Sequence, residues 1–451
     1  MKIFILIFFI FTLLSCSFDN KTGIWNDASN IKVDSSVVDS IDSSQTTTRY
    51  EDIFVKKKIF NEEVDASINF NSKLDDPIKI ENWKEQYGTK TNNVSNFSYS
   101  GNKELISRTS KLSKLAQKKN IVFYKNNIIN FDHKGRIFIY SLGLKKKIFQ
   151  YNFYKKKFKN VTKQIYLLIN NNTLYAADNL GYIYAINLED KSLTWAKNYG
   201  IPFRSNLKFV EGQIFLASQD NVIYSIDSKT GNKNWQYATN LTFLKSDFKN
   251  NFAIDEFNKN LFFLNTSGEF YSISYLNKKI NWVLNFNNST LSGDTSLFFS
   301  QPIVINKKNL VISTKNSIFN YNPVNGSTNW SLLSNSSLKP LLTANYTYIL
   351  SNSDLLICID NKTGQVLWSQ NIYKNLNKKI TKKKIGKFFD LIMINNEINI
   401  FSRNGYFLSF NYKNGNILNV KKISKKGINS EIVLLKNNIF LIDRNNRLLK
   451  F

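Results

Sequence analysis

The chain has 451 residues, a formal net charge of +28, 42% hydrophobic residues and 14% aromatic residues. This length can hold two or three average domains or one large all-β domain, and the abundance of Tyr and Phe favours strands. Because the whole chain has two cysteines, a scaffold held by several disulfides is excluded, and stability must come from a hydrophobic core.

The positive charge is compatible with a polyanion ligand, because clustered Lys and Arg displace counterions from phosphates. The lysines, however, are scattered through predicted turns in a sequence that is also rich in Asn, Ile and Phe, as an AT-rich coding bias would produce. We therefore interpret most of this charge as solvated surface charge and expect no nucleic-acid partner.

Residues 1–16, "MKIFILIFFIFTLLSC", combine an early Lys with an apolar run that is too short for a permanent membrane span. This pattern is typical of a signal peptide. The final "LLSC" resembles the lipobox of bacterial lipoproteins, which predicts that Cys16 carries the lipid and begins the mature protein. Ser17 at the next position resembles the signal for export to the outer membrane. An ordinary signal peptide that ends in Cys is the alternative.

Residues 17–76 are polar, and the stretch 35–54, "SSVVDSIDSSQTTTRYEDIF", is rich in Ser, Thr and Asp. Such a composition cannot bury enough apolar surface to form a core. It predicts a flexible, acidic tether between the lipid anchor and a basic domain that occupies residues 77–451.

The domain at 77–451 contains a repeat marked by Trp. Each Trp of the repeat follows a turn residue by fourteen positions, in the pairs Gly181 and Trp195, Asn221 and Trp235, Gly268 and Trp282, Asn316 and Trp330, and Asp354 and Trp368. The same interval joins Gly135 to Phe149 and Gly405 to Asn419. Gly, Asn and Asp tolerate the positive φ of tight strand reversals.

A strand follows each turn, and its fourth position carries a small or polar residue. These residues are Ala185, Ser225, Ser272, Asn320, Cys358 and Ser409. A small side chain at a fixed position lets a large ring approach closely. We therefore expect the Trp residues to be structural anchors in equivalent, largely buried sites between blades, and not parts of a catalytic site.

Two more short strands precede each turn, so that each unit has four antiparallel strands, which is the pattern of a β-propeller blade. An eighth unit, "EIVLLKNNIFLIDRNNRLLKF" at 431–451, lacks its outer strand. We predict an all-β, eight-bladed propeller in which an N-terminal strand closes the last blade. The expected donor is "PIKIENWKEQYG" at 77–88, with Trp83 as the eighth anchor.

The lipobox, the polar tether, "NWKEQYG" at 82–88 and the repeated Trp pattern together resemble the BamB family. The resemblance covers residues 77–451 and is supported by "QPIVINKKNLVIS" at 301–313 and by "LKPLLTANYTYILSNSDLLICIDNKTGQVLW" at 338–368. The Trp repeat itself is shared with quinoprotein dehydrogenases that bind pyrroloquinoline quinone (PQQ).

This resemblance implies a scaffold without catalysis or cofactor, lipid-anchored to the periplasmic face of the outer membrane. The implied partner is the barrel-inserting subunit of the β-barrel assembly machinery, bound through its periplasmic domains by a monomer within a hetero-complex. In relatives a loop between central blades carries much of the contact. Here that loop is matched by 289–302, "STLSGDTSLFFSQP", with Leu291, Ser292, Gly293, Leu297 and Phe298 as expected contacts. The family's Arg is missing, and Phe298 is also compatible with the start of the next inner strand.

Two other functions stay open. A PQQ-dependent dehydrogenase of the same fold would need an axial cluster of acidic residues and, by resemblance, adjacent cysteines, which are absent from the sequence. A periplasmic propeller that binds polyanions is suggested by the Lys runs 145–147, 155–157 and 382–384, provided that they share one face. His133, the single His, is expected to be a solvated turn residue, and Cys358 a buried strand residue.

Overall fold

The computed structural model describes residues 17–18, 25–26, 59–67, 73–114, 121–154, 158, 160–239, 251–286, 298–376 and 379–451. The chain divides into two compact units, Met1–Lys56 and Lys57–Phe451. In the first unit, β1 (Ser17–Phe18) pairs antiparallel with β2 (Trp25–Asn26).

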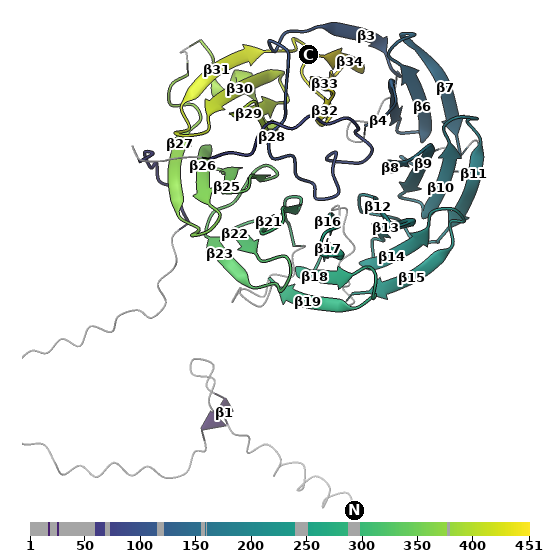
Figure 1. The fold of residues 1–451 in the computed structure, drawn as a ribbon, viewed down its shortest axis with the longest axis horizontal. Helices are drawn as coiled ribbons and strands as arrows, with labels where there is room; N and C mark the ends of the chain where they lie inside the picture. The colour runs from purple at the N-terminus through teal and green to yellow at the C-terminus, as the bar shows by residue number, and fades with distance from the viewer. Residues whose placement is uncertain are drawn as a thin grey trace, which may run out of the picture. The chain divides into compact units, whose positions relative to one another are not determined.

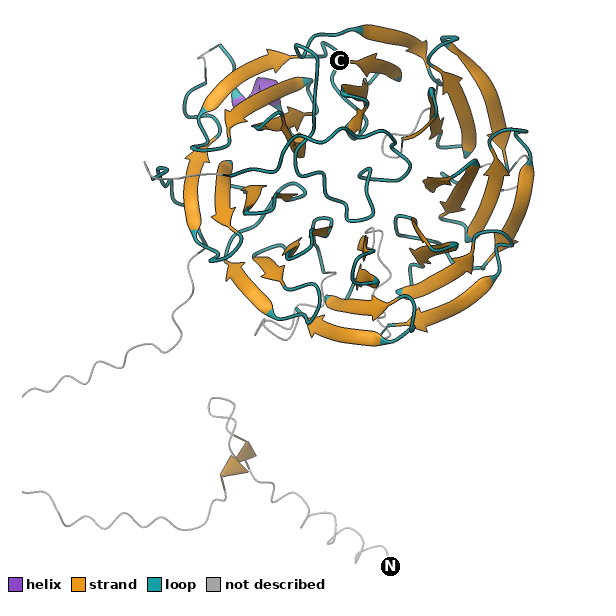
Figure 2. Cartoon of the chain, viewed as in Figure 1, coloured by secondary structure: helices purple, strands orange, loops and turns teal. Residues whose placement is uncertain are grey.

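The second unit is a closed ring of eight four-stranded antiparallel sheets (Figure 1 and Figure 2), which confirms the predicted all-β, eight-bladed propeller. We number the blades I to VIII and give their strands from the axis outward. Blade I has β4 (Val122–Tyr124), β5 (Asn127–Phe131), β6 (Arg136–Ser141) and β7 (Lys146–Asn152); blade II has β8 (Ile165–Asn170), β9 (Thr173–Asp178), β10 (Tyr182–Asn187) and β11 (Leu193–Asn198); blade III has β12 (Lys208–Val210), β13 (Gln213–Ala217), β14 (Val222–Asp227) and β15 (Lys233–Ala238); blade IV has β16 (Asn251–Asp255), β17 (Asn260–Leu264), β18 (Glu269–Ser274) and β19 (Ile280–Asn285).

The second half of the ring repeats this order. Blade V has β20 (Val304–Ile305), β21 (Leu310–Ser313), β22 (Ile318–Tyr321) and β23 (Thr328–Leu332); blade VI has β24 (Leu341–Leu342), β25 (Tyr346–Leu350), β26 (Leu355–Asp360) and β27 (Val366–Asn371); blade VII has β28 (Phe388–Ile394), β29 (Glu397–Ser402), β30 (Tyr406–Asn411) and β31 (Ile417–Lys422); blade VIII has β32 (Val433–Leu435), β33 (Asn438–Ile442), β34 (Arg447–Lys450) and β3 (Ser107–Lys111). One helical turn, α2 (Lys382–Ile385), joins blades VI and VII, and the Thr381 side chain caps it.

The connections fall on two faces of the ring, because neighbouring strands in each blade are antiparallel. Turns between the first and second strands and between the third and fourth strands share one face, which we call the hairpin face. Turns between the second and third strands, and the connections from one blade to the next, share the opposite face, which we call the connection face.

The last blade is closed by an N-terminal strand, as predicted, but the predicted donor is wrong. The closing strand is β3, in which Ser107 pairs with Lys450 and Arg108 with Leu449 of β34. The segment 77–88 lies at the axis instead, and Trp83 is buried in the core between blades VIII and I and not on an outer strand. Closure needs a free edge partner for β34, and β3 supplies it without an aromatic anchor.

The ring also contacts chain upstream of residue 77, where we expected the tether. The Phe60 amide donates to the Leu333 carbonyl at 2.7 Å, and Val64 forms a bridge with Ser369 of β27. The described residues 59–67 therefore lie along the outer strands of blades V and VI.

The Trp residues dock one blade onto the next. Each lies directly across from the small residue of the preceding strand, in the pairs Ala185 and Trp195, Ser225 and Trp235, Ser272 and Trp282, Asn320 and Trp330, and Cys358 and Trp368. Four indoles donate through Nε1 to a carbonyl in a turn of the following blade, the acceptors being Ser228, Val324, Asn361 and Tyr412 at 3.0–3.2 Å. Among the residues of those turns is a Gly whose added Cβ would lie 2.4–2.7 Å from the ring, so the Gly makes room for the Trp.

Burial of these anchors is less uniform than expected. Trp330 and Trp368 are 6% and 0% exposed, whereas Trp195, Trp235 and Trp282 are half-buried. Residues 59–67 lie along the outer strands of blades V and VI, which carry the two buried rings, and Phe60 and Ala66 pack against the clusters that contain them. The Nε1 atom of Trp235 has no hydrogen-bond partner within the described structure. The turn that it faces carries Lys278 with φ 59°, where the turns that accept the other four indoles have Gly.

Six of the predicted turn residues adopt positive φ, from 60° at Asn221 to 88° at Gly181. Asn316 is the exception: its turn is one residue shorter, and Ser317 donates to the Thr314 hydroxyl three positions back. In the longer turns the equivalent bond spans four positions, as from Tyr182 to Asp178, and the extra residue requires the left-handed conformation.

We expect Trp368→Ala to lower the free energy of unfolding by about 3–5 kcal/mol, because it leaves a cavity between blades VI and VII. Trp195→Ala is the matched control and should cost less, since its ring is half-exposed. Chemical denaturation of both variants measures the two losses. Equal losses would contradict the expectation that the more deeply buried Trp contributes more to the docking of blades.

Candidate functional site

The axis of the propeller is crossed by residues 77–99, which we call the axial segment (Figure 1). It bonds to first strands, or to the residues flanking them, around the ring: Phe123 N to Trp83 O at 2.8 Å, Ile169 N to Lys84 O at 2.8 Å, Ile254 N to Lys90 O at 2.9 Å, Ile305 N to Thr91 O at 3.2 Å, Phe97 N to Met393 O at 2.9 Å, Lys436 N to Ile80 O at 2.7 Å, and Asn93 Nδ2 to Leu342 O at 3.0 Å. Most of these atoms are near the carboxyl ends of the first strands, so the segment covers the axis at the hairpin face.

Blade III holds the axial segment through a buried ion pair. Lys208, the first residue of β12, is fully buried, and its Nζ lies 2.7 Å from the Glu85 carboxylate. The same ammonium donates to the Thr89 carbonyl at 2.9 Å and to Asn92 Oδ1 at 2.8 Å. All three N–H donors of the Lys are therefore satisfied. Burial lowers the pKa of Lys208, and Glu85 opposes this shift.

A second group of charges lies on the other side of the axis, in blades VI to VIII. Burial lowers the pKa of the Lys339 ammonium, against the opposing charges of Asp390 and Glu431. Burial likewise raises the pKa of Asp390, while Lys339 and Arg403 oppose the shift. The phenol of Tyr87, from the axial segment, has a pKa raised by burial and then by these two carboxylates. Opposite charges are thus balanced within the group.

The axial segment is tied to this group by Gln86, whose amide donates to both carboxylate oxygens of Glu431 at 3.0 and 3.3 Å. Arg403 donates to the Ser430 carbonyl at 2.8 Å. Each carboxylate therefore has a cation or an amide as neighbour, and the arrangement is suited to positioning the axial segment.

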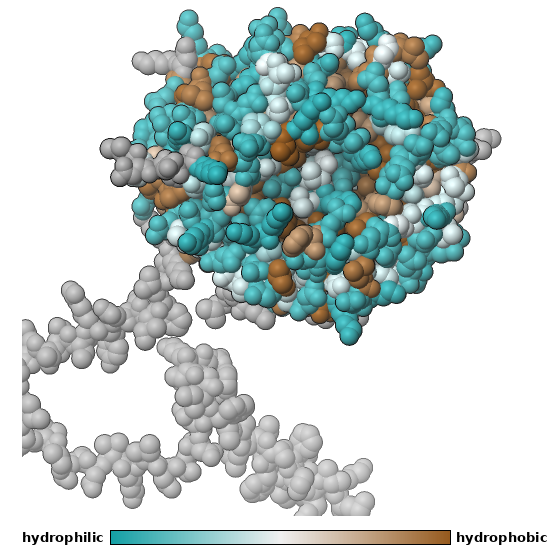
Figure 3. All heavy atoms as spheres, viewed as in Figure 1, coloured by the Kyte–Doolittle hydropathy of each residue, from teal (hydrophilic) through white to brown (hydrophobic). Residues whose placement is uncertain are grey.

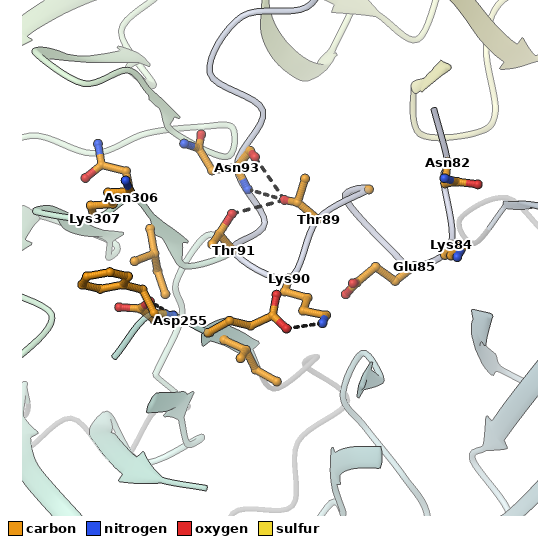
Figure 4. A pocket seen from close by; sticks show the side chains of 15 residues that line it. Asn82, Lys84, Glu85, Thr89, Lys90, Thr91, Asn93, Asp255, Asn306 and Lys307 are labelled. Carbon is orange, nitrogen blue, oxygen red and sulfur yellow. Dashed lines mark hydrogen bonds and ion pairs between the residues drawn. The ribbon is translucent and has the colours of Figure 1, made fainter. Parts of the chain in front are cut away.

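A cavity of about 590 Å³ lies where the axial segment meets the hairpins of blades IV and V. Lys90 pairs with Glu256 at 2.5 Å. Figure 4 shows Thr89 bonded to Thr91 and Asn93. Asp255 and Lys307 line the same cavity. Charges of both signs line it, so it has no preference for one sign of ligand. In the space-filling view along the same direction, the surface is mostly hydrophilic with separate hydrophobic patches (Figure 3).

The predicted partner loop, 289–302, falls between β19 and β20 in the sequence. Leu291, Ser292, Gly293 and Leu297 lie outside the described residues, as does Cys16. Phe298 is half-buried and stacks on Phe286 with ring centroids 5.4 Å apart, so it packs between blades IV and V, although β20 begins only at Val304.

The other residues considered in the sequence analysis, namely His133, Cys358 and the described Lys runs, lie in turns, in strands and in a helical turn. His133 is a half-buried residue of the turn between β5 and β6. Cys358 is a free, fully buried thiol, and burial raises its pKa well above the usual value. The Lys run 145–147 starts on the hairpin face and the run 382–384 is in α2 on the connection face; 155–157 lies outside the described residues. The two described runs thus do not share a face.

In the described part of the chain, no three His, Cys, Asp or Glu side chains gather closely enough to hold a metal ion. Among the helices described, none has the length and apolar character needed to cross a membrane.

The comparisons with known proteins are consistent with this architecture. A family model described as outer membrane protein assembly factor BamB matches residues 155–370 and 257–451. The chain belongs to this family. A search of curated protein sequences gives no match.

Solved structures share the fold of this BamB-family chain at low identity. BamB from Moraxella catarrhalis is 13% identical with a TM-score of 0.60, covering 77% of this chain and 98% of its own. The quinohemoprotein alcohol dehydrogenase ADHIIG from Pseudomonas putida HK5 is 9% identical with a TM-score of 0.58, covering 82% and 80%. The designed protein Ika8 is 10% identical with a TM-score of 0.57, covering 77% and 99%.

The described axial residues do not fit a quinone cofactor with a bound hard cation. Such a cation needs several free oxygen ligands, but Asp390 and Glu431 already lie beside Lys339 and Arg403. Glu85 is used by Lys208.

Sequence reasoning missed the axial segment. Its signal was a run of polar residues, "KEQYGTKTNN" at 84–93, in a part of the chain that otherwise alternates as a strand. Several of these residues serve as hydrogen-bond partners of first strands, which is a long-range role that no local pattern specifies.

We expect Lys208→Met to lower the free energy of unfolding by about 3–5 kcal/mol, because it leaves the Glu85 carboxylate buried without its cation. Lys90→Met is the matched control: its pair with Glu256 is more exposed and should be worth less than about 1 kcal/mol.

Adding Glu85→Leu to Lys208→Met should recover part of the loss, since no charge is then buried alone. Urea unfolding measures all three variants. If Lys208→Met were as stable as Lys90→Met, the axial ion pair would not be holding the segment.

Proposed function

We propose that this BamB-family chain is a non-catalytic lipoprotein scaffold of the outer-membrane β-barrel assembly machinery. It is anchored through Cys16 to the periplasmic face of the outer membrane and binds the barrel-inserting subunit. The observation that carries the proposal is the family match, which extends over residues 155–451 in two overlapping segments.

The chemistry of the described residues supports a scaffold. The repeated Trp and Gly residues are used in docking blades, and the axial charges are used in holding the chain's own axial segment. A rigid ring with variable loops suits protein binding, because repeat proteins place their variation in loops.

The partner surface that we propose is the loop 289–302, which falls between β19 and β20 in the sequence. Leu291 and Leu297 are its apolar anchors, since interface energy concentrates in a few large side chains. Ser292, Gly293 and Phe298 are the further contacts that we propose, and Phe298 packs on Phe286.

Exchange of Leu291 and Leu297 for Glu should weaken capture of the insertase subunit by about tenfold or more, which is roughly 1.4 kcal/mol, because charges replace apolar anchors. The thermal transition should stay nearly unchanged. Leu418→Glu is the matched control, since Leu418 is 52% exposed on the outer strand of blade VII.

Capture from detergent-solubilised membranes, with the co-purified subunit identified by mass spectrometry, measures this effect. Equal capture by the loop variant would move the interface elsewhere. PQQ-dependent dye reduction by the unaltered protein would contradict the non-catalytic role.

Cys16→Ser should move the protein from the membrane fraction to the soluble periplasmic fraction, because the lipid attachment site is lost. Fractionation with immunodetection checks this. Ser17→Ala is the control and should leave the protein in the membrane fraction; membrane retention of Cys16→Ser would contradict lipid anchoring.

A further inference from the structure

The docking unit between blades consists of three positions. One is the Trp of the outer strand, the second is the small residue across from it, and the third is the turn residue of the next blade that lies against the ring, as in Trp368, Cys358 and Gly415. The Gly of this turn stands four positions before that blade's own anchor, in Gly231 before Trp235 and in Gly364 before Trp368.

All three positions are changed where blade VIII meets blade I. Ser107 of β3 stands in the Trp position, since it pairs with Lys450, the fourth residue of β34. Lys450 therefore replaces the small residue. Lys145, four positions before Phe149, replaces the turn Gly and keeps its positive φ, at 49°.

Because Ser107 stands in place of a Trp, no indole fills this seam, and a groove lies there. Its volume is about 560 Å³, within the range of about 300–1,000 Å³ that is usual for ligand pockets. Ser107, Lys145 and Lys450 all line it, and Phe123, Leu142 and Phe440 supply apolar surface. The groove is therefore the vacant place of a docking Trp.

The neighbouring seam between blades VII and VIII also lacks a Trp, but the chain fills it. There Asn419 stands across from Ser409, and Lys103 donates to the Ser409 hydroxyl at 3.1 Å and to Glu397 at 2.5 Å. The Lys103 ammonium also lies 5.2 Å from the centre of the Phe407 ring. Absence of a Trp thus does not by itself leave an open groove.

The charge of the seam groove has one sign. Five basic residues line it and no Asp or Glu does; the basic residues are Arg108, Lys125, Lys145, Lys436 and Lys450. Lys125 has Glu189 at 3.7 Å. Arg108, Lys145 and Lys450 have no ion pair with any carboxylate of the described structure.

We propose that this seam groove binds an acidic peptide segment of a partner protein that carries a large aromatic side chain. The ring occupies the vacant Trp position against Lys145 and the apolar floor, where cation–π contact with the lysines adds to apolar burial. The flanking carboxylates pair with Arg108, Lys145 and Lys450. This site lies on blades VIII and I, apart from the loop 289–302 on the connection between blades IV and V.

The test uses a fluorescein-labelled pentapeptide with a central Trp between pairs of Glu and Asp, and its binding to the full chain is measured by fluorescence anisotropy. Ser107→Trp fills the groove without removing a charge and should weaken binding by about tenfold or more. Ser107→Thr, which keeps the space, is the matched control and should bind as the unaltered protein does.

Charge is tested separately. Lys145→Glu should weaken binding by a similar factor, while Lys413→Glu, the same reversal in a hairpin-face turn of blade VII, should have little effect. Thermal transitions of all four variants show whether the propeller stays closed. Lys145 is exposed in its turn, so its exchange is compatible with folding.

Three results would overturn the proposal. The first is equal binding of a peptide in which Ala replaces Trp, which would reduce the site to general charge attraction. The second is unchanged binding by Ser107→Trp. The third is binding of phosphatidylglycerol vesicles, lost in Ser107→Trp, together with no binding of the peptide, which would make the occupant an anionic lipid.

Discussion

Closure of the ring is the constraint on which the rest of the structure depends. Each blade contacts its two neighbours, so an open ring would expose one face of a terminal blade and the edge of β34. The chain solves this with one continuous stretch, in which residues 77–99 bind first strands around the axis and β3 then pairs with β34. The buried pair of Lys208 and Glu85 fixes this stretch, since either charge alone would be costly to bury.

The docking of blades explains why so few residue types recur. A Trp needs a small residue across from it and, in four cases, a Gly in the next blade, because a Cβ there would lie within 2.7 Å of the ring. Where the Gly is replaced, as by Lys278, the Trp235 Nε1 loses its acceptor within the described residues. The seam at blade VIII departs from the rule at all three positions, and it is the seam formed by segments far apart in sequence.

The blade count, the turn residues and the Trp role could be predicted because they depend on spacing that repeats within the chain. The closing strand could not. The last unit lacked its outer strand and Trp83 offered an eighth anchor, which favoured 77–88 as the donor, whereas β3, "SRTSK", has no anchor. The pairing of β3 with the edge of β34 uses backbone hydrogen bonds, so no particular side chain marks it in the sequence. The partner strand β34 lies about 340 residues further along the chain.

The residues of the candidate site also differ in how far their places could be predicted from the sequence. The places of His133 and Cys358 follow from local pattern, while the axial group of Tyr87, Asp390 and Glu431 depends on contacts between the axial segment and distant blades. The hairpin face carries the axial segment, which holds the ring closed through contacts with first strands.

Native-state hydrogen exchange of the axial segment tests the account of ring closure most directly. Peptide-resolved mass spectrometry should find that residues 97–99, whose amides donate to Met393 O, Ile78 O and Asn395 Oδ1, exchange as slowly as β8 and β16, because these hydrogen bonds open only when the ring itself opens. Rapid exchange of 97–99 while β8 and β16 stay protected would show that the ring closes without the segment and would contradict this explanation of ring closure.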